Sequence, residues 1–206
     1  MSCQLHQHVP SEAPLHPWEW PAKPWSRLHI DHEGPFLGAH FLILIDSHSK
    51  WMEVEKVSST ATEPTIHALR RIFATHGIPD AIVSDNGSAF TSHEFAMFCK
   101  ANGIRHIRSA PRHPSTHGLA ERAVEVFKSC VTKMDGGLPL EVRVTRFLAR
   151  YRITPQTTTG RAPAELLMNR IPKTHLDLLC GSLESRVLGK QDSQKKYDCG
   201  KKLRVF

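Results

Sequence analysis

Between residues 27 and 57, three segments have the apolar patterns of β-strands. They are residues 27–31, a short strand, residues 40–46, which are almost wholly apolar, and residues 51–57, whose side chains alternate with a two-residue period. Short connections rich in glycine, proline and serine join these segments. We therefore expect three consecutive strands linked by hairpins.

Beyond residue 60 the pattern changes to helices that alternate with strands. Residues 63–75 carry apolar side chains at helical spacing, with Thr62 as the expected N-cap. The remaining expected elements are a buried strand at 81–84, a helix at about 92–102, a strand at 104–109 and a long helix at about 118–134. This order predicts an α/β fold in which helices flank both faces of a five-stranded mixed sheet.

Composition divides the chain into four parts. The sequence predicts an extended linker arm at 1–24, a core domain at 25–135, a helical segment at 136–180 and a polar tail at 181–206. Tryptophans near the arm are expected to pack onto the core; they are Trp18, Trp20 and Trp25. The helical segment contains expected helices at 140–151 and after Pro163. The tail is too poor in apolar residues to fold alone.

The balance of charges favours a polyanionic partner. Lys and Arg number 27 against 20 Asp and Glu in 206 residues, which gives a formal net charge of +7 and a pI near 9.3. The five cysteines are irregularly spaced and indicate no disulfide framework. The longest apolar run, residues 41–45, is too short to cross a membrane. Since no signal peptide is recognised either, we expect no membrane partner and an intracellular setting.

Three acidic side chains fall where an α/β sheet places its ligands. Asp31 ends the first expected strand, Asp85 follows the fourth, and Glu121 lies in the first turn of the long helix. If the first and fourth strands are neighbours, Asp31 and Asp85 meet at one sheet edge. Clustered carboxylates repel one another unless a cation lies between them, and oxygen ligands select hard ions such as Mg²⁺ or Mn²⁺. A basic protein with such a cluster is a candidate for phosphoryl transfer on nucleic acid.

The spacing of the acids leaves other interpretations open. Each could be a solvated surface group, and Glu33 or Asp46 could take a place in the cluster. Asp46 opens a hairpin turn, so we assign it first to turn hydrogen bonding. The stretch SDNGSAF around Asp85 is also ordinary turn chemistry, because Asn and Asp bond to nearby backbone and Gly accepts positive φ.

Four longer segments resemble those of a known family. They are RLHIDHEGPF, FLILIDSHSKWMEV, IVSDNGSAFTSHEF and HPSTHGLAERAVEVFK. These segments are similar to the catalytic core of retroviral-type integrases, in the version carried by gypsy-type long-terminal-repeat retrotransposons. Thirty-five residues separate Asp85 from Glu121, as in the two-aspartate, one-glutamate signature of that family. The resemblance covers residues 14–180 and includes the segment RFLARYRITPQTTTGRAPAELLMNR.

The resemblance implies both a fold and a reaction. The fold is ribonuclease H-like, and the reaction is 3′-end processing of element DNA followed by its strand transfer into target DNA. Asp31, Asp85 and Glu121 would hold two Mg²⁺ or Mn²⁺ ions, with Asp31 bridging both. The resemblance further implies a homodimer or higher homo-oligomer that acts in the nucleus.

Expected DNA contacts surround these acids. Lys128 lies two helical turns after Glu121 and resembles the family's phosphate-binding lysine, although a solvated helix lysine is the alternative. The other expected contacts are Asn86, Arg112, Ser115, His117 and Arg122. His117 departs from the family, which usually has Asn or Gln there. Glu125 is a second departure, because its negative charge one turn after Glu121 would repel phosphates.

The modules that flank the core in this family are only partly represented. Cys3 resembles the last ligand of an N-terminal zinc module, so zinc binding is not expected, and the tail resembles the lead into an absent C-terminal barrel. The main rival function is a host-retained relic that binds DNA or a protein without strand transfer. A second rival is a ribonuclease H-like nuclease that cuts RNA in hybrids. The helix that begins HGLAER and the thirty-five-residue separation speak against the nuclease.

Overall fold

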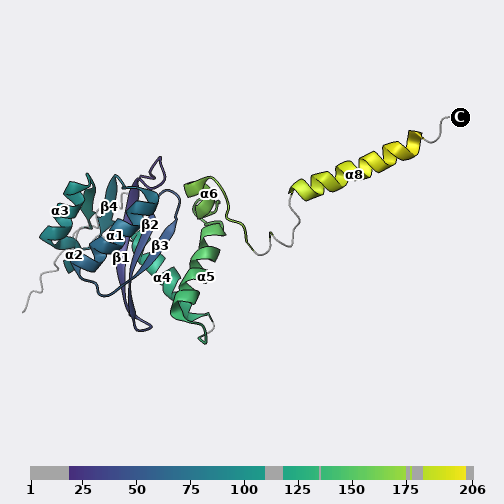
Figure 1. The fold of residues 1–206 in the computed structure, drawn as a ribbon. Coiled ribbons are helices and arrows are strands. Elements are labelled where there is room, and N and C mark those ends of the chain that lie inside the picture. The colour runs from purple at the N-terminus through teal and green to yellow at the C-terminus, as the bar shows by residue number, and fades with distance from the viewer. Residues whose placement is uncertain (1–18, 110–117, 135, 175–176, 178–182, 203–206) are drawn as a thin grey trace, which may run out of the picture. The chain divides into compact units, whose positions relative to one another are not determined.

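Five strands form one mixed sheet at the centre of the fold (Figure 1). β1 (Arg27–Phe36), β2 (Ala39–Asp46) and β3 (Met52–Val57) form an antiparallel meander, because the chain between them turns within a few residues. β4 (Ala81–Ser84) pairs in parallel with β1, and β5 (Arg105–Arg108) pairs in parallel with β4. The strand order β3-β2-β1-β4-β5 confirms the predicted five-stranded mixed sheet.

The computed structural model describes residues 19–109, 118–134, 136–174, 177 and 183–202. The chain divides into two units, Met1–Arg170 and Ile171–Phe206. The sheet and the helices that cover it belong to the first unit.

Helices cover both faces of the sheet, as predicted (Figure 1). Their bounds are α1 (Thr62–His76), α2 (Ser88–Thr91), α3 (His93–Ala101), α4 (Gly118–Thr132), α5 (Leu140–Ile153) and α6 (Pro163–Met168). Three details differ from the sequence prediction. β1 continues to Phe36, so Asp31 lies inside this strand and not at its end. The sequence predicts only a turn where α2 lies, and Ala61 rather than Thr62 occupies the N-cap of α1, without a side-chain hydrogen bond. The Thr62 hydroxyl instead donates to the Ala89 carbonyl at 3.3 Å, which joins α1 to α2.

Side chains that alternate along the strands divide the core into two clusters. Leu28 and Ile30 of β1 are buried with α1 and α3, whereas Phe41 and Ile43 of β2 are buried with α4 and α5. Because successive side chains point to opposite faces of a sheet, the odd-numbered positions of β1 lie on the α4 side. This side includes Asp31.

Aromatic rings hold α4 and α5 against the sheet. The ring of Phe127 on α4 is fully buried. It makes edge contacts with Phe36, Phe41 and Phe147 at centroid distances of 5.6, 5.2 and 5.7 Å. These contacts fix which flank of α4 lies beside β1 and which lies beside α5.

A buried polar cluster ties β3 to α1 and α5. The Glu53 carboxylate lies 2.7 Å from Arg152 Nη2 and 2.8 Å from His76 Nε2, and it accepts from Trp51 Nε1 at 2.7 Å. The Arg152 guanidinium also lies over the Trp51 ring, 4.1 Å from its centroid. Burial acts to raise the pKa of Glu53, but the hydrogen bond with His76 and the charge of Arg152 outweigh it, so the pKa is lowered. Glu53 is therefore an ionised group held by three partners.

Two of the tryptophans near the arm pack onto the core as predicted. Trp25 is buried, and its Nε1 donates to the Gly77 carbonyl at 2.8 Å. Trp20 stacks on His48 with ring centroids 4.4 Å apart and donates to the His48 carbonyl at 3.3 Å, although it remains largely exposed. Trp18 lies outside the described residues.

The second unit contains α8 (Leu183–Lys202), where composition predicts a polar tail that does not fold alone. Side chains at 187–198 are exposed, so this stretch of the helix buries no apolar face. Lys, Gln and Leu are strong helix formers, and local propensity accounts for the helix where a packed core does not. In the described parts of the chain, no helix combines the length and the apolar character that a membrane span needs.

Candidate active site

Two of the predicted site acids lie at the same level of neighbouring parallel strands. The last paired residues of β1 and β4 are His29 and Val83. Asp31 and Asp85 each follow that pair by two positions, and neighbouring strands lie about 4.8 Å apart. The sequence predicted this meeting on the condition that the first and fourth strands are neighbours, which the topology confirms.

Asp31 occupies a position on the face of the sheet that α4 covers. It follows Ile30, which belongs to the buried cluster on the α1 side, by one residue within β1, so alternation places it on the opposite face. Asp85 directly follows Ser84, the last residue of β4, and lies in the turn. Each aspartate is partly exposed, which leaves both open to solvent.

A histidine that sequence reasoning missed lies beside both acids. The backbone N–H of His32 donates to Asp31 Oδ1 at 2.8 Å, while its imidazole stacks on Phe90 at 4.7 Å and lies 2.9 Å from Thr65 Oγ1. Burial lowers the pKa of His32, against the opposing charges of Asp31 and Asp85. The charges of both carboxylates thus act on this one imidazole, which supports the expectation that Asp31 and Asp85 lie close together. The only sequence signal for His32 was its position directly after Asp31.

The turn after β4 orients the Asp85 carboxylate through its own backbone. Asp85 Oδ1 accepts from the Gly87 N–H at 2.9 Å. The Asn86 side-chain amide donates to the Ser109 carbonyl at 2.8 Å, which ties the turn to the residue that follows β5. The local hydrogen bonding predicted for the turn SDNGSAF is therefore present, and it orients the Asp85 carboxylate. The predicted contact of Asn86 with DNA stays a prediction, since its amide already has a partner in the fold.

Replacing Gly87 by alanine is expected to slow any reaction that uses Asp85. A Cβ at this position would lie 3.0 Å from Asp85 Oδ1, while the backbone is in an ordinary conformation. The carboxylate must therefore shift, and we expect a rate loss of roughly tenfold to a hundredfold with little change in melting temperature. Gly136→Ala is the matched control, because a Cβ there meets nothing within 4 Å. Equal rates for the two variants would contradict the positioning role of the turn.

Glu121 lies in the first turn of α4 with an exposed side chain. Lys128, two turns further along, shares that flank of the helix. Lys128 Nζ reaches Glu33 Oε1 at 3.0 Å, and Glu33 lies two residues after Asp31 on the same face of β1. The ion pair shows that the flank of α4 carrying Glu121 borders the strand carrying Asp31. It also removes Glu33 as a rival for the acid cluster, because this carboxylate has a cationic partner.

The three predicted acids have the ligand chemistry of a hard divalent cation, and their positions in the fold agree with such a site only in part. Asp31, Asp85 and Glu121 offer only carboxylate oxygens, the ligands that Mg²⁺ and Mn²⁺ prefer. Asp31 and Asp85 each follow the last pair of β1 and β4 by two positions. Within the described residues, however, no three His, Cys, Asp or Glu side chains are gathered closely enough to hold a metal ion. Metal binding by these three acids therefore stays a prediction.

Glu33 restrains the predicted phosphate-binding lysine, so Glu33→Gln is expected to raise DNA affinity by a few-fold. The substitution releases Lys128 and removes one negative charge beside it. One additional phosphate contact would steepen the salt dependence of log K by about one unit. The measurement is a salt titration of binding to a DNA duplex, with Glu63→Gln, an exposed acid in the first turn of α1, as the control. If Glu33→Gln and Glu63→Gln raise the DNA affinity by the same factor, the change in net charge alone explains the effect.

The remaining predicted positions fall in different places. Arg122 lies on the other flank of α4, facing α5 rather than the acids. Arg112, Ser115 and His117 lie outside the described residues. Asp46 is fully buried and accepts from the Ser49 hydroxyl at 2.6 Å and the Ser49 N–H at 2.9 Å, which confirms its assignment to the turn.

Residues 21–114, which include both aspartates, match the family model described as the integrase core domain. Over these residues the chain is similar to an integrase core domain. A Caenorhabditis elegans protein named uncharacterized protein K02A2.6 is 39% identical over 180 residues, which cover 86% of this chain and 14% of that protein. The Pro-Pol polyprotein of feline foamy virus is 32% identical over 125 residues, which cover 59% of this chain and 11% of the polyprotein. The chain thus spans a small part of the length of these relatives.

Solved structures show that the fold of this chain is ribonuclease H-like, as predicted. A chain of the simian T-cell lymphotropic virus intasome in complex with PP2A regulatory subunit B56 gamma superposes with a TM-score of 0.68. It is 22% identical, over 77% of this chain and 61% of that chain. The HTLV-2 integrase catalytic core domain in complex with magnesium gives a TM-score of 0.60 at 23% identity, over 71% of this chain and 98% of that chain.

Proposed function

We propose that this integrase core domain, of the gypsy-type retrotransposon group, carries out divalent-metal-dependent 3′-end processing and strand transfer of DNA. The observation that supports the proposal is the parallel pairing of β1 with β4, since Asp31 and Asp85 each follow the last pair of these strands by two positions. A basic surface charge favours a nucleic-acid substrate, since the formal net charge is +7.

Asp31, Asp85 and Glu121 would hold two Mg²⁺ or Mn²⁺ ions. Bound ions would polarise the scissile phosphodiester and activate the attacking oxygen. The first reaction is attack of water on a phosphodiester near the element end, which releases a 3′-hydroxyl. The second is attack of that hydroxyl on a phosphodiester of target DNA. The protein supplies no nucleophile in either step.

The chain's own residues position the reacting groups. Gly87 orients the Asp85 carboxylate through its backbone N–H. Lys128, on the flank of α4 that carries Glu121, would exchange its partner Glu33 for a DNA phosphate. His32 holds the end of β1 against α1 through Thr65 and does not need to touch the substrate.

The test of this proposal is a labelled duplex that carries element-end sequence, assayed with Mn²⁺, with Mg²⁺ and with a chelator. We expect cleavage and joining products only with a divalent ion. Glu121→Gln should lose both products, by at least about a hundredfold. Glu94→Gln is the matched control, because Glu94 lies in the first turn of α3, is exposed and has no place in the site.

The experiment also separates the rival functions. Products that persist in Glu121→Gln would remove this residue from the site. If the wild type binds DNA with normal salt dependence but yields no product with any divalent ion, the relic that only binds DNA becomes the better account.

A further inference from the structure

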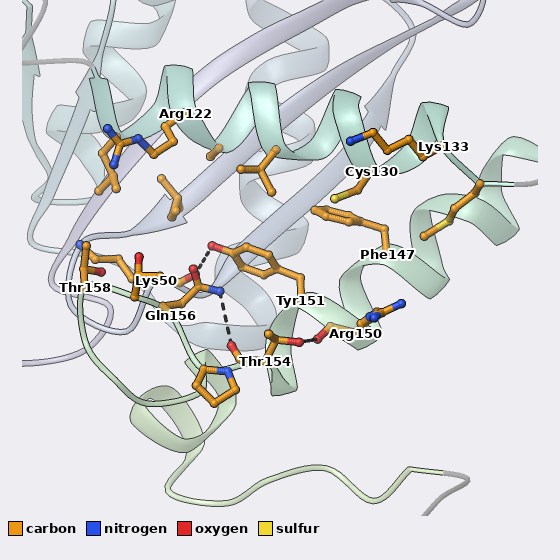
Figure 2. A pocket seen from close by; sticks show the side chains of 17 residues that line it. Lys50, Arg122, Cys130, Lys133, Phe147, Arg150, Tyr151, Thr154, Gln156 and Thr158 are labelled. Carbon is orange, nitrogen blue, oxygen red and sulfur yellow. Dashed lines mark hydrogen bonds between the residues drawn. The ribbon is translucent and has the colours of Figure 1, made fainter.

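A groove of about 590 Å³ lies between α4, α5 and residues 154–158 (Figure 2). Apolar side chains form its floor; they are Ile45, Leu119, Ala123, Val126, Phe147 and Tyr151. The volume and the apolar lining are those of ligand-binding sites. The groove lies on the flank of α4 that faces α5, whereas Glu121 and Lys128 lie on the flank beside β1. It is therefore separate from the candidate active site.

Cationic side chains surround this floor, and the described lining residues include no acid. The cations are Lys50, Arg122, Lys133 and Arg150, all labelled in Figure 2. The last three form no ion pair within the described parts of the chain. Lys50 donates from Nζ to the Ser47 carbonyl at 2.7 Å, and burial lowers its pKa. An anionic partner would gain from all four charges, because none is neutralised by a carboxylate in the groove.

The groove is long and has a fixed floor. Lys133 directly follows α4, and the helix rises about 15 Å between Arg122 and its last residue, Thr132. A single small anion cannot reach both of these charges. The Tyr151 hydroxyl donates to the Lys50 carbonyl at 3.0 Å and holds α5 to the turn between β2 and β3 (Figure 2). A ligand that uses the whole groove is a segment of about three helical turns.

We propose that this groove binds an acidic amphipathic segment of a partner protein, with apolar side chains on the floor and carboxylates at the cations of both ends. Charge complementarity favours this occupant over the alternatives. A DNA backbone has the charge but no apolar face for the floor. A second copy of this chain is itself basic, with a formal net charge of +7.

The test uses a fluorescein-labelled peptide of about twelve residues, built from Glu, Asp, Leu and Phe with its apolar residues at helical spacing. Binding to the full chain is followed by fluorescence anisotropy at roughly 0.1 M salt. We expect saturable binding that Arg150→Glu weakens by about tenfold. Arg146→Glu makes the same charge change on the same exposed side of α5 without lining the groove, so it should leave the affinity unchanged. Two control peptides carry Lys at the acidic positions or the same residues in scrambled order.

Cys130 supplies a second readout that reports the place of binding. It lines the groove and is exposed, whereas burial raises the pKa of Cys99 to about 11. In a variant with serine at the three remaining cysteine positions, Cys3, Cys180 and Cys199, the acidic peptide should slow alkylation of Cys130 several-fold at saturation. Arg150→Glu should abolish this protection at the same peptide concentration.

Four outcomes would overturn the proposal. They are equal binding of the acidic and lysine-substituted peptides, equal binding of the scrambled peptide, equal losses in Arg150→Glu and Arg146→Glu, and binding without protection of Cys130. A shift from dimer to monomer in Arg150→Glu, seen by sedimentation velocity, would assign the groove to a second copy of the chain instead. If a short DNA duplex displaces the peptide, and Arg150→Glu weakens binding of the duplex as much as binding of the peptide, the groove would be assigned to DNA.

Discussion

Replacing Asp85 by asparagine is expected to abolish both DNA cleavage and joining, with a rate loss of at least about 10³-fold in Mn²⁺. The substitution keeps the size of the side chain and an oxygen that can accept from the Gly87 N–H, as Asp85 Oδ1 does at 2.9 Å. It removes a negative charge that the proposed divalent ion would require. The fold should therefore survive while the reaction does not, and circular dichroism with a thermal scan would show this.

Asp80→Asn provides the matched control for this experiment. Asp80 is exposed five residues before Asp85, in the connection that precedes β4. The same charge is lost there without any change at the carboxylate pair, so we expect wild-type rates. Unchanged products in Asp85→Asn would end the assignment of this acid. If Asp80→Asn lost as much activity as Asp85→Asn, the change in net charge would explain the effect, and the position of Asp85 would not.

Replacing Glu53 by alanine is expected to cost about 3–5 kcal/mol of stability, which corresponds to a drop in melting temperature of roughly 10 °C. The loss arises because Arg152 and His76 would remain in a largely buried cluster without the carboxylate that they contact at 2.7 and 2.8 Å. Chemical denaturation of the wild type and the variant measures the difference. Since the pKa of Glu53 is lowered from its ordinary value of 4.5, this stability is present above that pH and is lost as the pH falls through the lowered pKa.

Glu55→Ala separates the buried cluster from an ordinary surface ion pair on the same strand. Glu55 lies 3.4 Å from Arg71, whose side chain is 62% exposed. An exposed pair contributes no more than about 1 kcal/mol, so this variant should unfold close to the wild type. If both variants lost the same free energy, the polar cluster around Glu53 would not hold β3, α1 and α5 together.

Much of the fold could be predicted from the sequence because its elements have strong periodic patterns. The meander β1–β3 and helices α1, α3, α4 and α5 follow from alternation and from helical spacing over six or more residues. The short helix α2 could not be predicted, since four residues after a turn carry no period. The helix α8 was missed for the opposite reason: it has helix-forming residues but no apolar face, so a prediction that relies on burial assigns it to a tail.

The candidate site could be predicted only in part, because sequence spacing fixes positions along elements and not the side chains between them. Asp85 follows the end of β4 as predicted, whereas Asp31 lies inside β1, because this strand continues to Phe36. The ion pair of Lys128 with Glu33 and the contacts of His32 depend on how α4 and α1 pack, which no local pattern encodes. The cations of the groove come from α4, α5 and a turn between strands, so they were not recognisable as one group in the sequence.

The parallel pairing of β1 with β4 limits where related sequences can carry an inserted residue. One extra residue inserted inside β4 would reverse the alternation of the residues after it and so change the direction of the Asp85 carboxylate. An insertion in the connection at 77–80 would be absorbed before the strand begins. Relatives that carry out the proposed reaction should therefore tolerate inserted residues before Ala81 but not between Ala81 and Asp85.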